Sequence, residues 1–201
     1  MTTANDRTAD HPIHKLFLDR WSPRAFTGEC IPQKTLDILF EAARWAPSSY
    51  NSQPWRFLYA RRDTAHWETF LGLLNEFNRS WAKAAGAIVI VVSRSTMLPP
   101  GADNEVPSHS HSFDAGAAWA QLALQATLSG WHAHAMVGFD RDRAFSSLNV
   151  PAGYRVEAAI AIGKLGPKTL LPEALAAREA PSRRKPLAEI AFEGGFTKPP
   201  R

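Results

Sequence analysis

The chain has a single cysteine and no long apolar run, and both shortages restrict what kind of protein it can be. Cys30 has no second cysteine to pair with, so no internal disulfide can form, and we expect a reducing compartment. The apolar run Ala87–Val92 is far shorter than the roughly 20 residues that a membrane-spanning helix needs. Residues 1–15 also lack the apolar segment of a secretory signal, so we expect a cytoplasmic protein without a membrane partner.

Several chemical motifs are missing as well. The sequence contains no G-x-G-x-x-G after a strand-like run, no G-x-x-x-x-G-K-[ST] and no G-x-S-x-G. These absences argue against a dedicated dinucleotide fold, a Walker-type phosphate loop and the nucleophile elbow of a hydrolase. The tryptophans mostly fall on apolar helical faces rather than among basic residues, so we expect no nucleic-acid partner.

Metal-binding and nucleophilic side chains are scarce too. His109 with His111 and His132 with His134 could each bind a metal ion, because residues i and i+2 of a strand share a face. No carboxylate or thiolate stands at useful spacing beside either pair, so no metal site is predicted. Cys30 has no neighbour in sequence that would activate its thiol, and we expect no nucleophilic role for it.

What is present is an ordinary globular composition of 201 residues, 45% hydrophobic and 21% charged. We expect a loose arm over residues 1–12, followed by one domain over residues 13–201. Helical and strand-like patterns follow one another irregularly, which favours the α+β class over a regular βαβ repeat. The predicted helices cover residues 13–19, 32–46, 64–80, 113–129, 140–148 and 171–179, and the predicted strands cover 56–62, 87–93, 131–138 and 154–163.

Two of these helices have informative apolar patterns. The helix 113–129 is apolar nearly all round, so it must be central or lie in a dimer interface. Residues 96–112 before it form a long polar loop, a length typical of lids and binding loops. The segment 64–80 is predicted as one amphipathic helix, because its large apolar residues recur at helical spacing: Trp67, Phe70, Leu71, Leu74 and Phe77.

Three segments carry side chains suited to a phosphate-bearing ligand. In RWSPRAF, the residues Arg20, Ser22 and Arg24 stand at i, i+2 and i+4, so in an extended segment they would point one way. In APSSYNSQPW, hydroxyls and amides are packed between prolines more densely than turn chemistry alone requires. SRRKPL places three cations beside a proline. Taken alone, RWSPRAF and SRRKPL also fit ordinary solvated surface charges, whereas the three segments together favour a phosphate-bearing ligand.

In their order and spacing, R-x-S-x-R-x-F, APSSYNSQPW and RRKPL resemble the FMN-dependent nitroreductase family, as do AMVGF and the helix DAGAAWAQLALQATLSG. The resemblance covers about residues 13–190, and PSSYNSQPW is its most specific piece. It implies an α+β homodimer with a central, mainly antiparallel sheet flanked by helices and an extended terminal arm. It also implies tightly bound FMN in clefts at the subunit interface, each cleft built from both chains.

The resemblance implies a role for each matched residue. Arg20 and Ser22 would hold the phosphate and ribityl end of FMN, where Trp21 occupies a slot that is often basic or polar, and Arg24 would reach the pyrimidine edge. Val137 and Gly138 match the turn whose backbone faces flavin N5, and no catalytic side chain is implied. The other implied FMN-binding residues are Asn78 beside the pyrimidine ring, Arg183, Arg184 and Lys185 at the phosphate, and Pro47, Ser48, Ser49 and Asn51 from the partner subunit.

The implied activity is that of an FMN-dependent NAD(P)H oxidoreductase of nitroreductase type. NADH or NADPH would reduce the flavin and leave, and a nitroaromatic, quinone or similar acceptor would then occupy the same face in a ping-pong cycle. Phe113 is a candidate wall of the acceptor pocket or a purely structural residue, and Gln53 would support its own loop. Two alternatives stay open: a relative with other flavin chemistry, such as ene reduction, dehalogenation or flavin fragmentation, and a flavin-binding protein without turnover.

Overall fold

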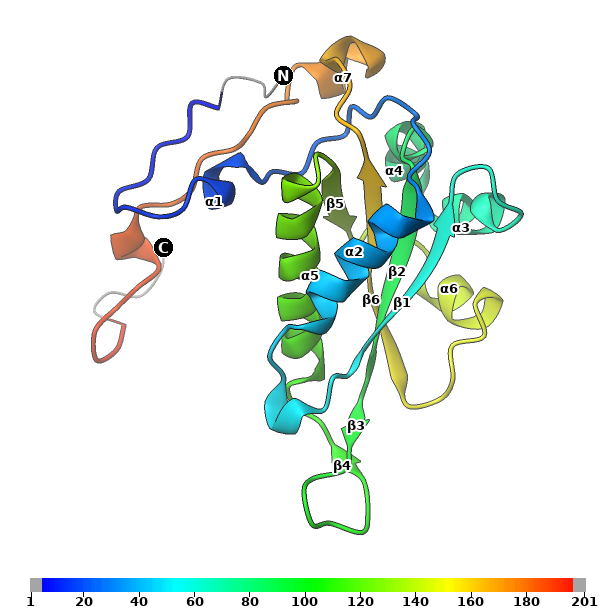
Figure 1. Ribbon diagram of the computed structural model, residues 1–201, viewed down its shortest axis with the longest axis vertical. Coiled ribbons are helices and arrows are strands. Elements are labelled where there is room, and N and C mark those ends of the chain that lie inside the picture. Colours follow the sequence, from blue (N-terminus) through cyan, green and yellow to red (C-terminus); the bar gives the residue numbers. More distant parts are fainter. Residues whose placement is uncertain (1–4, 197–201) are drawn as a thin grey trace.

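The computed structural model describes residues 5–196 and is built around a four-stranded antiparallel sheet (Figure 1). The strands lie in the order β1-β2-β6-β5. Their bounds are Trp55–Arg61 for β1, Ala87–Arg94 for β2, Tyr154–Gly163 for β6 and His132–Met136 for β5. All three strand pairs of this sheet are antiparallel, which confirms the predicted α+β class and the mainly antiparallel sheet.

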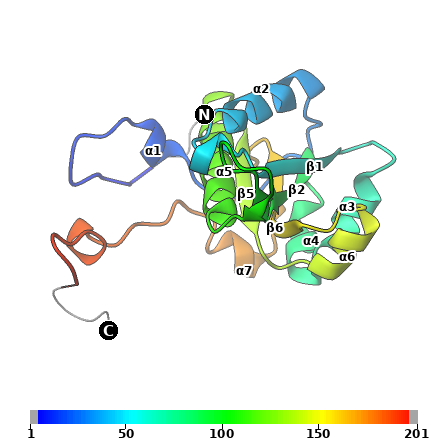
Figure 2. The same cartoon turned by 90° about the horizontal axis from the view of Figure 1, so that it is seen from below.

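Helices cover both faces of this sheet (Figure 2). Helices α2 (Gln33–Arg44) and α5 (His111–Leu128) pack on one face, where Leu36, Leu39 and Leu122 are fully buried. Helices α3 (Trp67–Leu73), α4 (Glu76–Ala82) and α6 (Arg141–Ser147) pack on the other face. Because successive residues of a strand point to opposite faces, β2 contributes to both apolar cores and is buried from Ala87 to Ser93.

The two terminal segments leave the body on the same side of the molecule (Figures 1 and 2). The first carries the short helix α1 (Leu16–Asp19), and the second follows α7 (Glu173–Ala176). Short 3₁₀ turns cover Ser49–Asn51, Lys168–Leu170 and Leu187–Glu189. Within the described residues, no helix is both long and apolar enough to cross a membrane.

The single helix predicted over residues 64–80 is wrong, because the chain breaks at Leu74 and forms α3 and α4 instead. Leu74 is extended and pairs with Phe139, and the Asn75 side chain caps α4 by accepting from the backbone N–H of Asn78 at 2.9 Å. The break also turns Phe77 outward, where 49% of its surface is exposed, so the predicted apolar stripe ends at Leu74.

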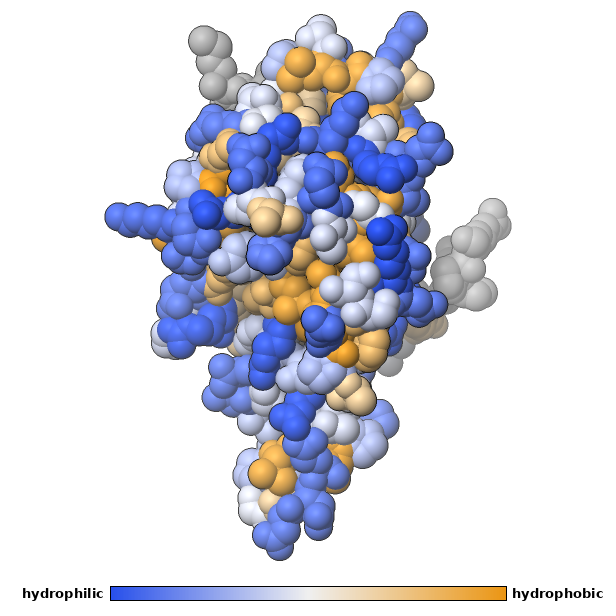
Figure 3. Space-filling view, turned by 90° about the vertical axis from the view of Figure 1, so that its right-hand side faces the viewer, coloured by the Kyte–Doolittle hydropathy of each residue, from blue (hydrophilic) through white to orange (hydrophobic). Residues whose placement is uncertain are grey.

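The predicted loop 96–112 contains a small hairpin, β3 (Thr96–Met97) and β4 (Val106–Pro107). It is held by an ion pair between Arg94 and Glu105. The hairpin forms the narrow lower end of the molecule in Figure 3, where Leu98 and Val106 are exposed. His111 begins α5, so the first histidine pair does not lie on a strand as its metal-binding geometry required.

Helix α5 ends where the sequence predicts, and the structure shows which of its faces is exposed. It ends before Gly130, whose φ of +71° suits a residue without a Cβ. One face of α5 is buried against the sheet, whereas the opposite face exposes a stripe of apolar and small residues: Phe113, Gly116, Ala120 and Leu128. The helix is therefore half buried within this chain.

Candidate functional site

Five arginines line one cavity of about 390 Å³, here called the arginine cavity. The loop after α1 contributes Arg20 and Arg24, and the segment around and after α7 contributes Arg178 and Arg184. Arg7, from the N-terminal segment, is the fifth. The remaining lining residues are Trp21, Ser22, His134, Ala180 and Ser182, so the lining contains no aspartate or glutamate.

The RWSPRAF segment turns its three polar side chains toward this cavity, as its spacing predicts. Nη1 of Arg20 donates to Oγ of Ser22 at 3.3 Å. Trp21 lies against the edge of His132, with 6.4 Å between the ring centroids, and is buried. Trp21 therefore backs the cavity with an apolar wall rather than adding a charge.

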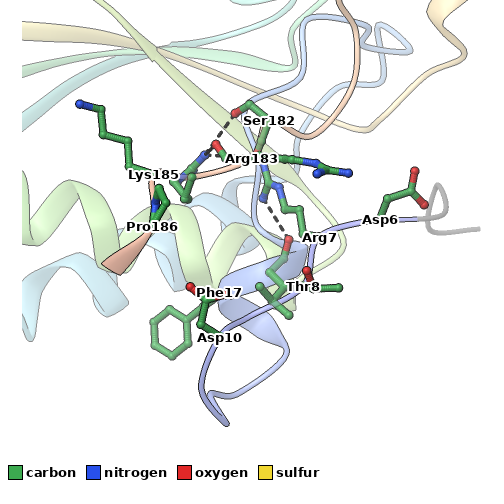
Figure 4. Close-up of a pocket in the computed structure, with 11 residues that line it drawn as sticks. Asp6, Arg7, Thr8, Asp10, Phe17, Ser182, Arg183, Lys185 and Pro186 are labelled. Atoms are coloured by element: carbon green, nitrogen blue, oxygen red, sulfur yellow. Dashed lines mark hydrogen bonds between the residues drawn. The ribbon is translucent and has the colours of Figure 1, made fainter. Parts of the chain in front are cut away.

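The three cations of SRRKPL separate in the structure. Arg184 lines the arginine cavity, whereas Arg183 and Lys185 are absent from its lining and border a neighbouring cavity of about 310 Å³ that Arg184 also borders. Figure 4 shows this second cavity, between the segment that carries Asp6 and Asp10 and the segment that carries Ser182 to Pro186. Of the three cations, Arg184 is thus the one that lines the arginine cavity with Arg20 and Arg24.

Burial and neighbouring positive charges lower the pKa values of two arginines in the arginine cavity. Desolvation lowers the pKa of Arg20, and the charge of Arg184 lowers it further. Desolvation is also the main cause of the lowered pKa of Arg7, followed by the charges of Arg184 and Arg20. Crowding cations in a partly desolvated space is unfavourable, and a bound anion would offset that repulsion.

The buried carboxylate of Glu179 holds the loop that carries Arg24. Oε1 of Glu179 accepts the backbone N–H groups of Arg24 at 2.5 Å and Ala25 at 2.8 Å. Its Oε2 lies 3.9 Å from Nη1 of Arg24, while Nε of Arg24 is buried without a hydrogen-bond partner. Glu179 fixes the backbone of the loop and orients Arg24, yet leaves that arginine with a free donor.

His134 forms part of the cavity wall. Its Nδ1–H donates to the carbonyl of Pro23 at 3.0 Å, since a carbonyl can only accept. Burial lowers the pKa of His134, so the imidazole is neutral at pH 7. Within the described residues, no group of three or more histidine, cysteine, aspartate or glutamate side chains is arranged to hold a metal ion.

A second constellation joins the turn after β5 to the start of α4. The buried side chain of Asn78 donates from Nδ2 to the carbonyl of Gly138 at 2.9 Å, and the backbone N–H of Asn75 donates to the same oxygen at 3.1 Å. A Cβ on Gly138 would lie 2.6 Å from the side-chain amide nitrogens of both asparagines, so a larger residue would force one of these side chains to move. Val137 beside it is exposed. The structure therefore brings together three of the predicted residues, Asn78, Val137 and Gly138.

The APSSYNSQPW segment forms a tight, strained loop. Tyr50, Asn51 and Gln53 have positive φ angles of 51°, 53° and 47°, which cost energy in residues with a Cβ. The backbone N–H of Gln53 donates to Oγ of Ser48 at 3.0 Å, and its side-chain Nε2 donates to the carbonyl of Asn51 at 3.2 Å. Gln53 thus braces its own loop. Pro47 and Asn51 are exposed, and Ser48 and Ser49 are partly so.

This loop is anchored to α5 and not to the arginine cavity. Oδ2 of the buried Asp114 accepts the backbone N–H of Ser49 at 3.2 Å and the hydroxyl of Ser110 at 2.9 Å. Phe113, next to Asp114, is 82% exposed. None of the residues 47–53 lines the arginine cavity of its own chain.

Comparison with known proteins assigns this architecture. Residues 18–76 match the model of the nitroreductase family. A solved structure described as an oxidoreductase containing FMN is 51% identical, covers 98% of this chain and 99% of its own, and superimposes with a TM-score of 0.92. The chain belongs to the nitroreductase family.

Two further proteins are similar to parts of the chain. An uncharacterized 15.4 kDa protein of Mycolicibacterium smegmatis is 38% identical over 132 residues, which is 65% of this chain and 84% of that protein. The major NAD(P)H-flavin oxidoreductase of Aliivibrio fischeri is 29% identical over 87 residues, which is 42% of this chain and 40% of that protein. The matched stretch of the nitroreductase family model includes Arg20, Ser22, Arg24 and the whole 47–53 loop.

Four residues that shape these sites were not found from the sequence: Arg7, Asn75, Asp114 and Glu179. Asn75 did carry a signal, because asparagine is a favoured helix N-cap residue, and the cap would have split the predicted helix 64–80. The other three act through contacts with distant segments, such as the 155 positions that separate Glu179 from Arg24. The local sequence pattern around these three residues does not predict such contacts.

Proposed function

We propose that this nitroreductase-family chain is an FMN-dependent NAD(P)H oxidoreductase. The arginine cavity is the observation that carries the proposal. A flavin phosphate bears up to two negative charges, and Arg20, Arg184 and Ser22 all offer donors to one cavity. The buried, unpartnered Nε–H of Arg24 fits an acceptor of the same ligand, because a buried donor without a partner is costly.

The relatives favour the same cofactor and donor. The structure at 51% identity is of an oxidoreductase containing FMN, and its likeness extends over nearly the whole chain. The Aliivibrio fischeri relative is an NAD(P)H-flavin oxidoreductase, which supports a nicotinamide donor.

When bound, FMN would supply the redox chemistry between NADH or NADPH and the acceptor. The residues of the chain would bind and orient it. Arg20, Ser22 and Arg184 would hold its phosphate end, with Arg24 reaching toward the ring system. Asn78, fixed by its bond to Gly138, would meet the pyrimidine edge of the flavin. No side-chain acid or base is assigned to the reaction.

The site is proposed to be completed by a second copy of the chain. Strain of the kind found in the 47–53 loop is kept where it serves a function, and this loop lies outside the arginine cavity of its own chain. The exposed stripe of α5 gives the second copy an apolar surface to pack on. In such a homodimer, Pro47, Ser48, Ser49 and Asn51 would line the flavin of the neighbouring subunit.

The acceptor is proposed to be a small nitroaromatic, quinone or similar oxidant that stacks on the exposed flavin face. Phe113 exposes its aromatic ring on the first turn of α5, next to Asp114, which holds the 47–53 loop through the backbone of Ser49. A planar acceptor would pack well against such a ring.

Anaerobic absorption spectroscopy of the purified protein tests the proposal. We expect a yellow protein whose flavin bands bleach with NADH or NADPH and return when a quinone is added. A colourless preparation that neither takes up FMN nor responds to reductant would contradict it.

A further inference from the structure

Arg7 lies outside every motif of the sequence, yet it lines the arginine cavity with Arg20 and Arg184. Its Nη1 donates to the carbonyl of Leu18 at 3.0 Å and to the carbonyl of Arg20 at 2.8 Å. Figure 4 shows Arg7 between the segment that carries Phe17 and the one that carries Ser182. These bonds hold the guanidinium beside the loop that begins the RWSPRAF motif.

The remaining donors of Arg7 are not all used. Its Nε is buried and has no hydrogen-bond partner. In a guanidinium, the N–H of Nε and one N–H of Nη2 form a parallel fork that matches two oxygens of a phosphate. Because Nη1 is occupied by the two carbonyls, the Nε edge is the part left for a ligand.

The surroundings of Arg7 also call for an anion. Arg20 and Arg184 are close enough to lower its pKa, after the larger effect of burial. The cavity that the three residues share has no acidic side chain in its lining. Arg7 also borders the neighbouring cavity, whose lining includes Asp6 and Asp10, but among the described residues no carboxylate lies within ion-pair distance of it. A bound anion would therefore balance the charge of Arg7.

The N-terminal segment is tied down at two points. Asn5 donates from Nδ2 to the same carbonyl of Leu18 that accepts from Arg7. Residues 5–10 have no helix or strand of their own, so these side-chain bonds define their path. The segment is therefore placed by contacts that lie directly beside the phosphate end of the proposed site.

We propose that Arg7 is a phosphate-binding residue and that residues 5–10 form a strap across the phosphate end of the bound cofactor. This inference rests on the proposed function, since FMN supplies the phosphate. Arg7 would join Arg20 and Arg184 as a third cation on the phosphate. Arg183 and Lys185, which are absent from the lining of the arginine cavity, would contribute less.

Flavin binding to the apoprotein tests this assignment, with FMN and riboflavin compared by fluorescence titration. Riboflavin has the same ring system and lacks the phosphate. We expect Arg7→Ala to weaken FMN binding at least about tenfold, the loss typical of a charge-assisted hydrogen bond, and to leave riboflavin binding unchanged. Arg7→Lys keeps the charge and loses the parallel pair of N–H donors, so its FMN affinity should lie between those of the wild type and Arg7→Ala.

Arg62→Ala is the matched control, because Nη1 of Arg62 also donates to two backbone carbonyls, those of Lys83 and Ala85, outside the arginine cavity. It should leave the FMN-to-riboflavin preference unchanged. Equal loss of both flavins in Arg7→Ala, or no loss of FMN, would overturn the phosphate role. If Arg7→Ala does not fold, Arg7→Lys gives the same comparison.

A second readout separates this proposal from the proposed function. Inorganic phosphate should raise the melting temperature of the wild-type apoprotein, and this rise should shrink in Arg7→Ala. A wild type that responds to phosphate through Arg7 but binds no FMN would refute the flavin assignment and keep the phosphate role. A wild-type apoprotein that binds neither inorganic phosphate nor FMN would overturn both the phosphate role of Arg7 and the proposed function.

Discussion

The side-chain amide of Asn78 donates to the carbonyl of Gly138 at 2.9 Å, across 60 positions of sequence. The bond joins the start of α4 to the turn after β5, and Asn75 donates its backbone N–H to the same oxygen. The contact is close because Gly138 has no side chain. It connects the two segments that the proposed function places along the flavin ring.

Gly138→Ala should therefore disturb this turn. The new Cβ would lie 2.6 Å from both asparagine nitrogens, so Asn75 or Asn78 must move. We expect a loss of about 1–3 kcal/mol in the free energy of unfolding, typical of overpacking, measured by urea denaturation of the apoprotein. Gly195→Ala is the control, because nothing lies within 4 Å of its added Cβ. Equal stability of the two variants would mean that the turn relaxes freely.

Glu179→Ala should destabilise the loop that carries Arg24. It removes an acceptor of two backbone N–H groups in a buried position. The expected loss in the free energy of unfolding is about 2–3 kcal/mol, the range for hydrogen bonds to charged groups. Glu179→Gln keeps an acceptor oxygen and should lose less, and the exposed Glu173→Ala should be nearly neutral. A neutral Glu179→Ala would show that water replaces the carboxylate.

Acidification should destabilise the apoprotein through its buried histidines. Burial lowers the pKa of both His132 and His134 in the folded chain. Below the unfolded-state pKa near 6.5, the unfolded chain takes up protons that the native chain resists, so stability is full above that pH and lost as the pH falls through it. Each histidine contributes a slope of at most about 1.4 kcal/mol per pH unit.

Urea denaturation between pH 7.5 and about 5.5 measures this slope. His134→Gln should flatten it, because the glutamine amide cannot titrate but can still donate to Pro23. His109→Gln, at an exposed position, is the control. A slope that His134→Gln leaves unchanged would remove His134 from the acid response.

Ala120→Glu should disrupt the proposed dimer. Ala120 lies in the exposed stripe of α5, so a partner packed there would have to bury the new carboxylate. We expect light scattering to show a monomer in place of a dimer, together with loss of FMN. Ala174→Glu, at an exposed position of α7, should remain dimeric. A dimer that tolerates Ala120→Glu would place the interface elsewhere.

The parts of the fold predicted well were those that local chemistry decides. Asp140 caps α6 by accepting the backbone N–H of Arg143 at 2.9 Å, as an aspartate before a short helix predicts. The alternation of Arg20, Ser22 and Arg24 placed all three around one cavity, because an extended segment points every second side chain the same way. Both features depend on residues a few positions apart.

Other features could not be predicted because distant segments decide them. Leu74 would continue a helix on periodicity alone, but its pairing with Phe139 extends it and splits the predicted helix. Arg183, Arg184 and Lys185 look equivalent in sequence, and only the path of the chain after α7 directs Arg184 into the arginine cavity. Arg7 belongs to a segment without a pattern, and its position follows from the carbonyls of Leu18 and Arg20.

A crystal structure of the protein purified with its flavin would show where the phosphate lies and which chain supplies the 47–53 loop. We predict a homodimer with the FMN phosphate in the arginine cavity of one chain, against Arg20, Ser22 and Arg184. We also predict that Ser48, Ser49 and Asn51 beside that flavin come from the other chain. A flavin phosphate outside the arginine cavity, or a 47–53 loop that serves the flavin of its own chain, would contradict this prediction.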